Sequence, residues 1–465
     1  MRAAVMRLAV GFAAAAAALG LFLADAARAQ EAVGDWHGVL KAGGVELRIG
    51  VAIKPGAGGG LTGSLTSPDQ GEEVIPLQDV RMDQGKLSFA APMVRGRYEA
   101  DWDPALSVWN GRWTQASPLP LILTKGPVPT QARPQLPAKP YPYREEEVAF
   151  DSAPGVKLAG TLTLPAGKGP FPVAVLITGS GPQDRDEALL GHRPFLVLAD
   201  NLTRSGVAVL RYDDRGVAKS TGSFQAATGS DFAVDAAAAV RFLRQRKDID
   251  PARVGLIGHS EGGMIAPMVA AKDPKIAFVV LLAGPGVPST QLMAAQRAAV
   301  GKVLGAPPEA LARNEVLAGG IDSLLATTTD WEGAKIEMTR RLGQAAATAG
   351  MPADQAVARN AMLFTAWYRE FIAYDPRPNL AALRMPVLAI NGANDVQVVA
   401  SQNLPAIREA LKANPDATVE ALPGLNHLFQ TSATGAPADY GRIEETFAPA
   451  ALTQISDWVR IRVLP

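Results

Sequence analysis

The fold is decided by the stretch Val254-Gly255-Leu256-Ile257-Gly258-His259-Ser260-Glu261-Gly262-Gly263, which leads from an apolar run into a helical segment ending at Ala271. The run has the character of a buried strand, so Ser260 falls on a strand-to-helix turn. Glycines on either side of the serine allow neighbouring backbone to pass close to a strained turn. This context predicts that the Ser260 hydroxyl is exposed at the tip of the turn, as a nucleophile requires.

Apolar runs and helical segments alternate around this stretch. The runs have the length and composition of strands covered on both faces, and they lie at 173–177, 207–210, 254–257, 278–282 and 386–390. The helical segments include Pro194 to Arg204, Ser230 to Gln245 with Ser230 as the N-cap, and Glu261 to Ala271. The alternation predicts an α/β fold, a mostly parallel sheet with helices on both faces and a ligand site at the carboxyl ends of its strands. Residues 145–288 and 384–465 would form its two parts.

Residues 289–383 interrupt the alternation between the fourth and fifth runs. They are rich in Ala, Leu, Arg, Glu and Gln, which predicts helices, and they are too long for a simple crossover. An insertion that only packs on the sheet is one interpretation; we favour a helical cap over the active site, because the insertion leaves the sheet at its catalytic edge. Trp367, Phe371 and Tyr374 are candidates to line an acyl pocket there, although their spacing also suits a packed helix face.

The first 29 residues have the pattern of a secretory signal peptide. Two arginines precede an apolar run from Leu8 to Ala24, and Ala27-Arg28-Ala29 is a cleavage site; a retained anchor helix is the alternative. Cleavage removes three basic and one acidic residue from 45 of each, which leaves a net charge of −2. We therefore expect an exported product, periplasmic or extracellular, with no membrane span after cleavage.

An all-β domain is predicted next, at residues 30–125. Seven or eight short β-rich runs separated by Gly, Pro and Asp, the first of them at 47–53, are typical of a small antiparallel barrel or sandwich. Its tryptophans, at 36, 102, 109 and 113, suit core and rim packing better than a ligand cage. Six prolines within residues 126–144 then predict an extended linker.

The composition excludes several kinds of function. With 45 Lys+Arg against 45 Asp+Glu the chain has no basic excess to hold a phosphate backbone, so no nucleic-acid partner is expected. The absence of Cys excludes disulfides, thiolate metal sites and a cysteine nucleophile. We find neither a zinc-binding histidine spacing nor a dinucleotide fingerprint, and Lys219-Ser220 lacks the glycine of a P-loop, so neither metal nor cofactor is expected.

A serine hydroxyl needs a base to take its proton, and the chain has four histidines. His37 lies in the β domain, His192 precedes the second apolar run, and His259 adjoins the nucleophile with its side chain directed away by the turn. We expect all three to be structural, and His192 is the first alternative to have a functional role. His427 follows a short strand at 418–422 and a loop. We predict that His427 is the base.

An orienting acid and two oxyanion donors complete the predicted site. Asp395 follows the strand at 387–390, and the chain order Ser260, Asp395, His427 is that of the α/β hydrolases. The Glu261 amide is one predicted oxyanion donor, and the Ser180 amide in the glycine-containing loop 178–182 is the second, with Gly181 as the near alternative.

Four segments together resemble the α/β-hydrolase superfamily, specifically its secreted bacterial esterases with an N-terminal β domain, which are related to the serine aminopeptidase-like branch. They are 258–263 (GHSEGG), 178–187 (TGSGPQDRDE), 211–220 (RYDDRGVAKS) and 391–396 (NGANDV). The resemblance covers residues 145–465 and, more loosely, 31–125. It implies a carboxylic-ester hydrolase with Ser260, Asp395 and His427 as its triad. Ala218 departs from the pattern, since relatives commonly have Gly there.

The expected reaction is acyl transfer from a small ester to water through an acyl-enzyme on the serine. A peptidase or amidase with the same triad is one alternative, and a binding protein with an inert hydrolase unit is another. The charged residues Asp213, Asp214 and Arg215 are expected to brace a loop through ion pairs. The acyl chain length, the alcohol preference and the oligomeric state are not predicted by the sequence.

Overall fold

The computed structural model describes residues 32–42, 45–56, 60–69, 73–115, 117–129, 131–348 and 350–464. The chain divides into two compact units, Met1–Ala132 and Arg133–Pro465, which are described separately. The predicted signal peptide at residues 1–29 lies outside the described residues. Among the described residues, no helix combines the length and hydropathy that a bilayer span requires.

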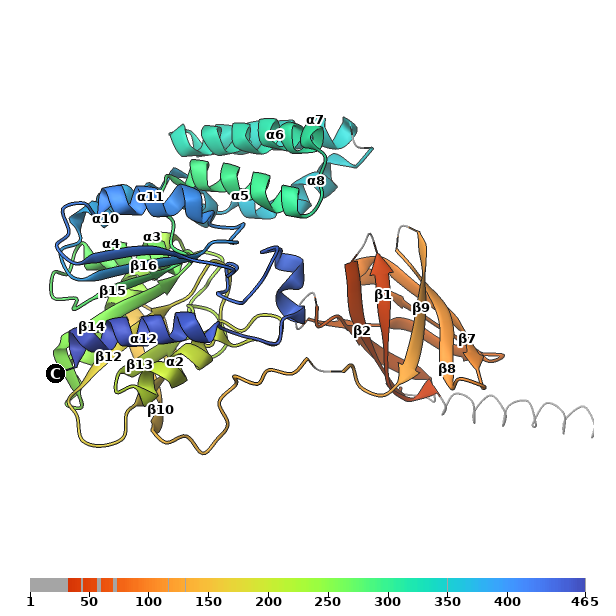
Figure 1. The fold of residues 1–465 in the computed structure, drawn as a ribbon. Helices are drawn as coiled ribbons and strands as arrows, with labels where there is room; N and C mark the ends of the chain where they lie inside the picture. The colour runs from red at the N-terminus through yellow and green to blue at the C-terminus, as the bar shows by residue number, and fades with distance from the viewer. Residues whose placement is uncertain are drawn as a thin grey trace, which may run out of the picture. The chain divides into compact units, whose positions relative to one another are not determined.

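The first unit is one antiparallel sheet (Figure 1). Its strands are β1 (Gly34–Ala42), β2 (Val45–Pro55), β3 (Leu61–Thr66), β4 (Val74–Pro76), β5 (Gln78–Asp83), β6 (Lys86–Ala91), β7 (Gly96–Asp103), β8 (Val108–Thr114) and β9 (Pro118–Lys125). They lie in the order β4-β3-β2-β1-β9-β8-β7-β6-β5. The amide of Leu77, between the two end strands, donates to Gly63 O on β3, so the sheet curls back toward itself. The predicted barrel-like β fold is confirmed, with β1 as a strand that the sequence analysis missed.

Tryptophans fill the interior of this first unit. Trp36, Trp109 and Trp113 are buried, and Trp102 packs against the first two with ring centroids 6.0 and 4.9 Å away. The Tyr98 hydroxyl lies among them and donates to main-chain carbonyls of β8 and β9. The prediction of core and rim packing is therefore confirmed: three of the tryptophans are buried in the core, and Trp102 lies at its rim.

The second unit contains an eight-stranded sheet in the order β10-β11-β13-β12-β14-β15-β16-β17. Its strands are β10 (Arg144–Ala153), β11 (Val156–Leu164), β12 (Phe171–Ile177), β13 (Ala208–Tyr212), β14 (Ile249–His259), β15 (Val279–Leu282), β16 (Val387–Gly392) and β17 (Ala417–Leu422). All neighbours from β13 to β17 pair in parallel, and β11 pairs antiparallel with both of its neighbours. The parallel sheet expected from the apolar runs is confirmed.

Helices cover both faces of this sheet (Figure 1). One face packs against α3 (Gly229–Arg244), α4 (Gly262–Ala270), α10 (Arg377–Ala382) and α11 (Ala400–Ala410). The other face packs against α2 (Pro194–Arg204) and α12 (Pro449–Val463). Because both faces are covered, all seven residues of β12 are buried. Helix α3 begins two residues earlier than expected: Thr228, not Ser230, is its N-cap, in a capping box with Asp231.

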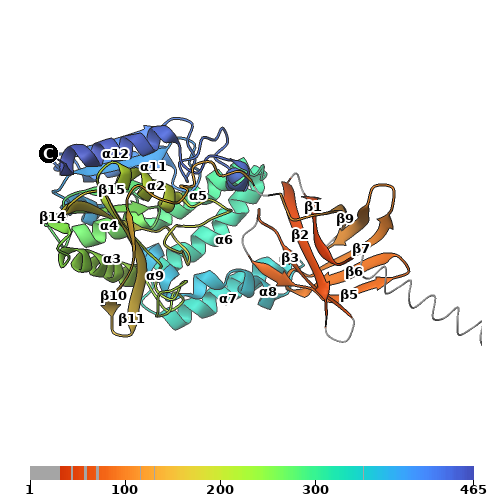
Figure 2. The same ribbon diagram turned by 90° about the horizontal axis from the view of Figure 1, so that it is seen from below.

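The insertion between β15 and β16 is helical, as predicted for residues 289–383. Besides α10, it contains α5 (Ser289–Val303), α6 (Pro308–Thr327), α7 (Trp331–Thr348), α8 (Ala353–Arg359) and α9 (Ala366–Ala373). Its helices enclose a small apolar core of their own around Met338, Ile321 and Ile372. Figure 1 shows α6 and α7 side by side at the top of the second unit, and Figure 2 shows α7 along its lower edge.

Candidate active site

Ser260 occupies a strained turn at the carboxyl end of the parallel sheet. Strand β14 ends at His259 and α4 begins at Gly262, so the predicted strand-turn-helix is confirmed. Ser260 has a φ of 55°, the left-handed region, which costs an L-residue about 1–2 kcal/mol. A hydrogen bond from Ser260 N to Leu282 O, 2.9 Å long, holds the turn against β15. Such strain is typical of a side chain that is held in place for chemistry.

The glycines of the turn are required because other backbone passes directly beside them. A Cβ on Gly258 would lie 2.0 Å from Gly262 O, and a Cβ on Gly262 would lie 2.1 Å from Ile177 O. Neither contact is possible for real atoms, and backbone cannot swing aside as a flexible side chain can. Gly258 therefore packs directly on the backbone of Gly262, and Gly262 packs on the end of β12. This close packing fixes the position of Ser260 between them.

His427 and Asp395 meet at the same edge of the sheet. His427 Nδ1 lies 2.8 Å from Asp395 Oδ2, and both side chains are buried. The other carboxylate oxygen of Asp395 accepts the amides of Gln397 and Val398, at 2.7 and 2.9 Å. These bonds fix the carboxylate, which in turn fixes the ring of His427 with Nε2 pointing away from the aspartate.

The contact between the serine and the histidine is not formed in this structure. In the part of the chain that the structure describes, neither Ser260 Oγ nor His427 Nε2 has a hydrogen-bond partner. Such contacts are often long or poorly aligned before a substrate closes the site. The structure thus brings two of the three predicted triad side chains into contact, and it places the third after β14, at the same edge of the sheet but with β15 between β14 and β16.

The loop after β12 runs beside Ser260. A Cβ on Gly179 would lie 3.2 Å from Ser260 Cβ, so the loop backbone is in van der Waals reach of the nucleophile. The Gly179 amide is already engaged, since it donates to Glu187 Oε1 at 2.7 Å. The amides of Ser180, Gly181 and Glu261 have no partner among the described residues. The two alternatives for the second oxyanion donor both stay open.

Two buried residues beside this site had not been predicted to act together. Glu187 was quoted only as part of a motif, and His259 was expected to be structural. His259 Nδ1 lies 2.9 Å from Glu187 Oε1, and its Nε2 lies 3.1 Å from the main-chain oxygen of His427. The signal available in the sequence was a histidine directly before the nucleophile, but nothing indicated which residue it would contact.

Trp367 is the aromatic side chain of the insertion that reaches the nucleophile turn. Its Nε1 donates to Glu261 Oε1 at 2.7 Å, and its ring stacks on Phe371 with centroids 5.1 Å apart. Tyr374 lies elsewhere: it lines a cavity of about 750 Å³ formed with α3 and α4. A role for these three residues in an acyl pocket stays a prediction.

The Glu261 side chain is a buried acid next to the nucleophile. Burial raises the pKa of Glu261 to about 7, against the opposing effect of the Trp367 hydrogen bond. The folded state thus favours the protonated carboxyl, and the resulting stability is present below the pKa of an unfolded Glu and lost as the pH rises through about 7.

We expect the Glu261→Gln variant to lose this pH dependence, because an amide cannot ionise and its oxygen can still accept from Trp367. Between about pH 4 and pH 8 the native chain should lose up to about 3 kcal/mol of unfolding free energy relative to the variant. Urea unfolding across this range measures the difference. Glu309→Gln, an exposed change in the insertion, is the control and should show no such trend. Parallel stability curves for Glu261→Gln and the native chain would contradict the assignment.

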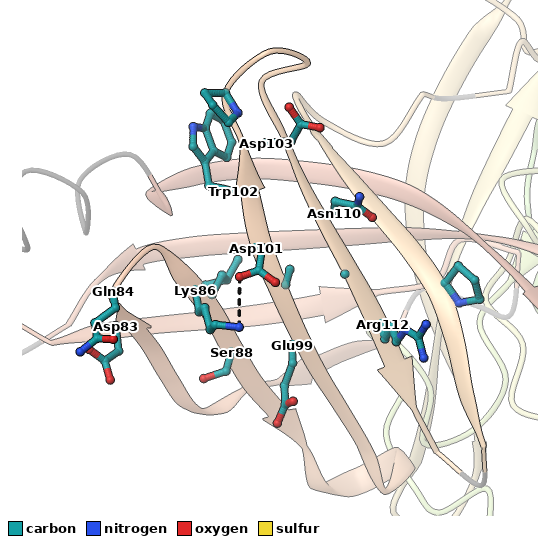
Figure 3. A pocket seen from close by; sticks show the side chains of 15 residues that line it. Asp83, Gln84, Lys86, Ser88, Glu99, Asp101, Trp102, Asp103, Asn110 and Arg112 are labelled. Carbon is teal, nitrogen blue, oxygen red and sulfur yellow. Dashed lines mark ion pairs between the residues drawn. The ribbon is translucent and has the colours of Figure 1, made fainter.

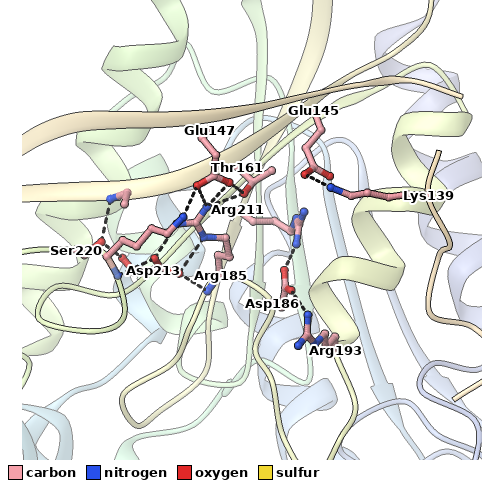
Figure 4. Close-up of polar contacts among 12 residues, drawn as sticks. Lys139, Glu145, Glu147, Thr161, Arg185, Asp186, Arg193, Arg211, Asp213 and Ser220 are labelled. Carbon is pink, nitrogen blue, oxygen red and sulfur yellow. Dashed lines mark hydrogen bonds and ion pairs between the residues drawn. The ribbon is translucent and has the colours of Figure 1, made fainter. Parts of the chain in front are cut away.

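Charged residues brace the loops behind the site, as Figure 4 shows for one network. Arg185 Nη2 lies 2.8 Å from Asp213 Oδ2, and Arg185 also pairs with Glu147 on β10. Arg215 pairs with Asp235 of α3 at 2.7 Å. The expected ion pairs of Asp213 and Arg215 are confirmed. Asp214 was predicted wrongly: it accepts from Thr178 Oγ1 and Gln183 N and, among the described residues, has no ion pair.

The first unit carries a separate polar groove of about 940 Å³ (Figure 3). Charged side chains of β6, β7 and β8 line it, and Lys86 pairs with Asp101 across it at 3.1 Å. All the residues that line the groove belong to the first unit, and none of them is a predicted catalytic residue.

The strand order, the antiparallel β11 and the loops that carry Ser260, Asp395 and His427 define an α/β hydrolase. Within this class the chain belongs to the family described as serine aminopeptidase, S33, whose model matches residues 193–431. The resemblance to the α/β-hydrolase superfamily and its serine aminopeptidase-like branch is thereby confirmed.

Individual relatives match shorter stretches. Esterase EstD of Thermotoga maritima is 34% identical over 154 residues, which are 33% of this chain and 35% of EstD. Thiohydrolase apmlB of Arthrinium phaeospermum is 31% identical over 147 residues, 31% of this chain and 44% of that protein. The chain thus spans less than half the length of either relative. Among solved structures, the Pyrococcus furiosus esterase Pf2001 aligns with a TM-score of 0.44 at 16% identity, covering 72% of this chain and 99% of that one.

Proposed function

We propose that this chain is a serine hydrolase that cleaves small carboxylic esters, with water as the second substrate. The observation that carries the proposal is the buried His427–Asp395 hydrogen bond at the same sheet edge as the strained Ser260 turn. A histidine oriented by a carboxylate is the base that a serine nucleophile needs. The similarity to EstD supports an ester as the substrate.

The proposed reaction has two halves. His427 Nε2 takes the proton of Ser260 Oγ, which attacks the ester carbonyl, and the amides of Glu261 and Ser180 stabilise the oxyanion. Protonated His427 gives its proton to the leaving alkoxide, and an acyl-enzyme remains. Water then attacks the acyl group with His427 as base, which releases the carboxylic acid and restores the serine. Asp395 holds the ring and stabilises the imidazolium throughout.

A peptidase or amidase with the same residues is the second candidate, and the description of the family as serine aminopeptidases supports it. The two candidates differ in the leaving group, an alcohol or an amine. We expect faster turnover of p-nitrophenyl acyl esters than of aminoacyl anilides by the same preparation. The reverse order would favour the peptidase.

Labelling by a fluorophosphonate tests whether any serine chemistry occurs, since this reagent reacts only with an activated serine. We expect one equivalent on Ser260, located by peptide mass spectrometry. A chain that remains unlabelled would instead support an inert hydrolase unit in a binding protein, the remaining alternative. Export to the periplasm or beyond is also a proposal, which rests on the sequence of residues 1–29.

A further inference from the structure

A buried pair, Glu187 and His259, links the two segments that flank Ser260. Glu187 follows the loop 178–182, which carries the second predicted oxyanion donor and is called the oxyanion loop below. His259 directly precedes the nucleophile. Glu187 Oε1 accepts from Gly179 N at 2.7 Å and contacts His259 Nδ1 at 2.9 Å. His259 Nε2 contacts the main-chain oxygen of His427 at 3.1 Å. One carboxylate therefore reaches the oxyanion loop directly and the predicted base through a single imidazole.

The partners of His259 determine how many protons it carries. A main-chain oxygen only accepts hydrogen bonds, so Nε2 must be protonated to bond with His427 O. Nδ1 faces a carboxylate oxygen, which also needs a hydrogen between the two atoms. The pair thus holds one proton more than a neutral imidazole beside a carboxylate would hold, and an imidazolium–carboxylate pair satisfies every contact.

The charges around the ring support this protonation state. Burial by itself lowers the pKa of His259, but the charge and hydrogen bond of Glu187, the His427 carbonyl and the charge of Asp395 together raise it above its ordinary value. The His427 ring also faces His259, with centroids 4.9 Å apart. These groups come from the loops after β12, β16 and β17, and the first and last of these loops contact the His259 ring.

We propose that Glu187 and His259 are a positioning pair: they hold the backbone of His427 and the oxyanion loop in place beside Ser260. They do so only while the pair keeps its shared proton. The inference rests on the proposed function, because its readout is ester turnover. When the proton is lost at alkaline pH, one nitrogen of the His259 ring presents a lone pair to an oxygen, either that of Glu187 or the main-chain oxygen of His427. Two acceptors repel each other, so the loop that carries that oxygen must move away. Movement of either loop misplaces the base or an oxyanion donor. Both groups act on the transition state, so kcat falls and KM changes little.

The test compares kcat and KM of Glu187→Gln and the native chain for p-nitrophenyl acetate from about pH 5 to about pH 10. Gln keeps an acceptor for Gly179 N but removes the negative charge, so His259 should lose its proton more readily. We expect the alkaline limb of kcat to move toward lower pH by about one unit or more, with activity recovered on acidification. His259→Ala should lower kcat on the order of 10²-fold at all pH values.

Asp273→Asn is the matched control, because it also converts an ion-paired carboxylate to an amide but lies beyond the other end of α4. It should keep the native profile. A Glu187→Gln variant with the native kcat and pH profile would overturn the inference. If that variant fails to fold, selective ¹⁵N-histidine spectra of the native chain decide: a buried imidazolium near pH 8 supports the pair, and a neutral ring overturns it.

The two proposals fail in different ways. A native chain that neither cleaves the ester nor reacts with a fluorophosphonate would refute the proposed function. A native chain that does both, together with an unshifted Glu187→Gln profile, would refute only the positioning pair.

Discussion

Replacement of Ser260 by Ala should lower kcat for ester cleavage on the order of 10⁶-fold, because the variant lacks the atom that forms the acyl-enzyme. The fold should survive, since Ser260 Oγ makes no hydrogen bond among the described residues and Ala meets the same backbone strain as Ser. Steady-state rates with p-nitrophenyl acetate measure the loss, and thermal unfolding checks the fold.

Ser401→Ala, an exposed change on α11, is the control for this experiment and should leave the rate unaltered. Fluorophosphonate labelling should disappear in Ser260→Ala and persist in Ser401→Ala. Full ester cleavage by the Ser260→Ala chain would refute the proposed mechanism.

Asp395→Asn should lower kcat on the order of 10⁴-fold while the chain stays folded. The asparagine oxygen can still accept the amides of Gln397 and Val398, so the loop keeps its shape. The new amide donor would face His427 Nδ1, which must then accept a hydrogen bond and leave its proton on Nε2. A histidine with Nε2 protonated cannot take the serine proton.

The control variant is Asp457→Asn. It removes an exposed carboxylate of α12, which pairs with Arg460 at 3.4 Å. Only Asp395→Asn should affect kcat, and both variants should unfold near the native temperature. An Asp395→Asn enzyme with native turnover would show that another group orients the base.

Elements with a strong local signal could be predicted from the sequence. The apolar runs of β12 and β15 contain no polar residue, so they indicate buried strands clearly. The glycine pattern from Gly258 to Gly263 indicates the turn between strand and helix. Strand β1 was missed because its two glycines and charged end weaken the pattern. Strand β10 was missed because it lies at the sheet edge, where its charged residues face solvent.

Long-range polar contacts could not be predicted. His427 and Asp395 were paired by chain order, which says nothing of the distance between them. Glu187 and His259 are 72 positions apart, and their bond depends on how two loops cross the sheet edge. Asp214 looks like its charged neighbours in sequence, but it hydrogen-bonds with Thr178 while Asp213 and Arg215 find opposite charges.

The helical insertion departs from β15 and returns at β16, two strands that pair directly through Leu282 and Ile390. Because the two strands are parallel, the insertion leaves at the carboxyl end of β15 and must cross to the amino end of β16, at the opposite edge of the sheet. A shorter or longer insertion would leave the β15–β16 hydrogen bonds in place only if it still crossed the sheet from one edge to the other.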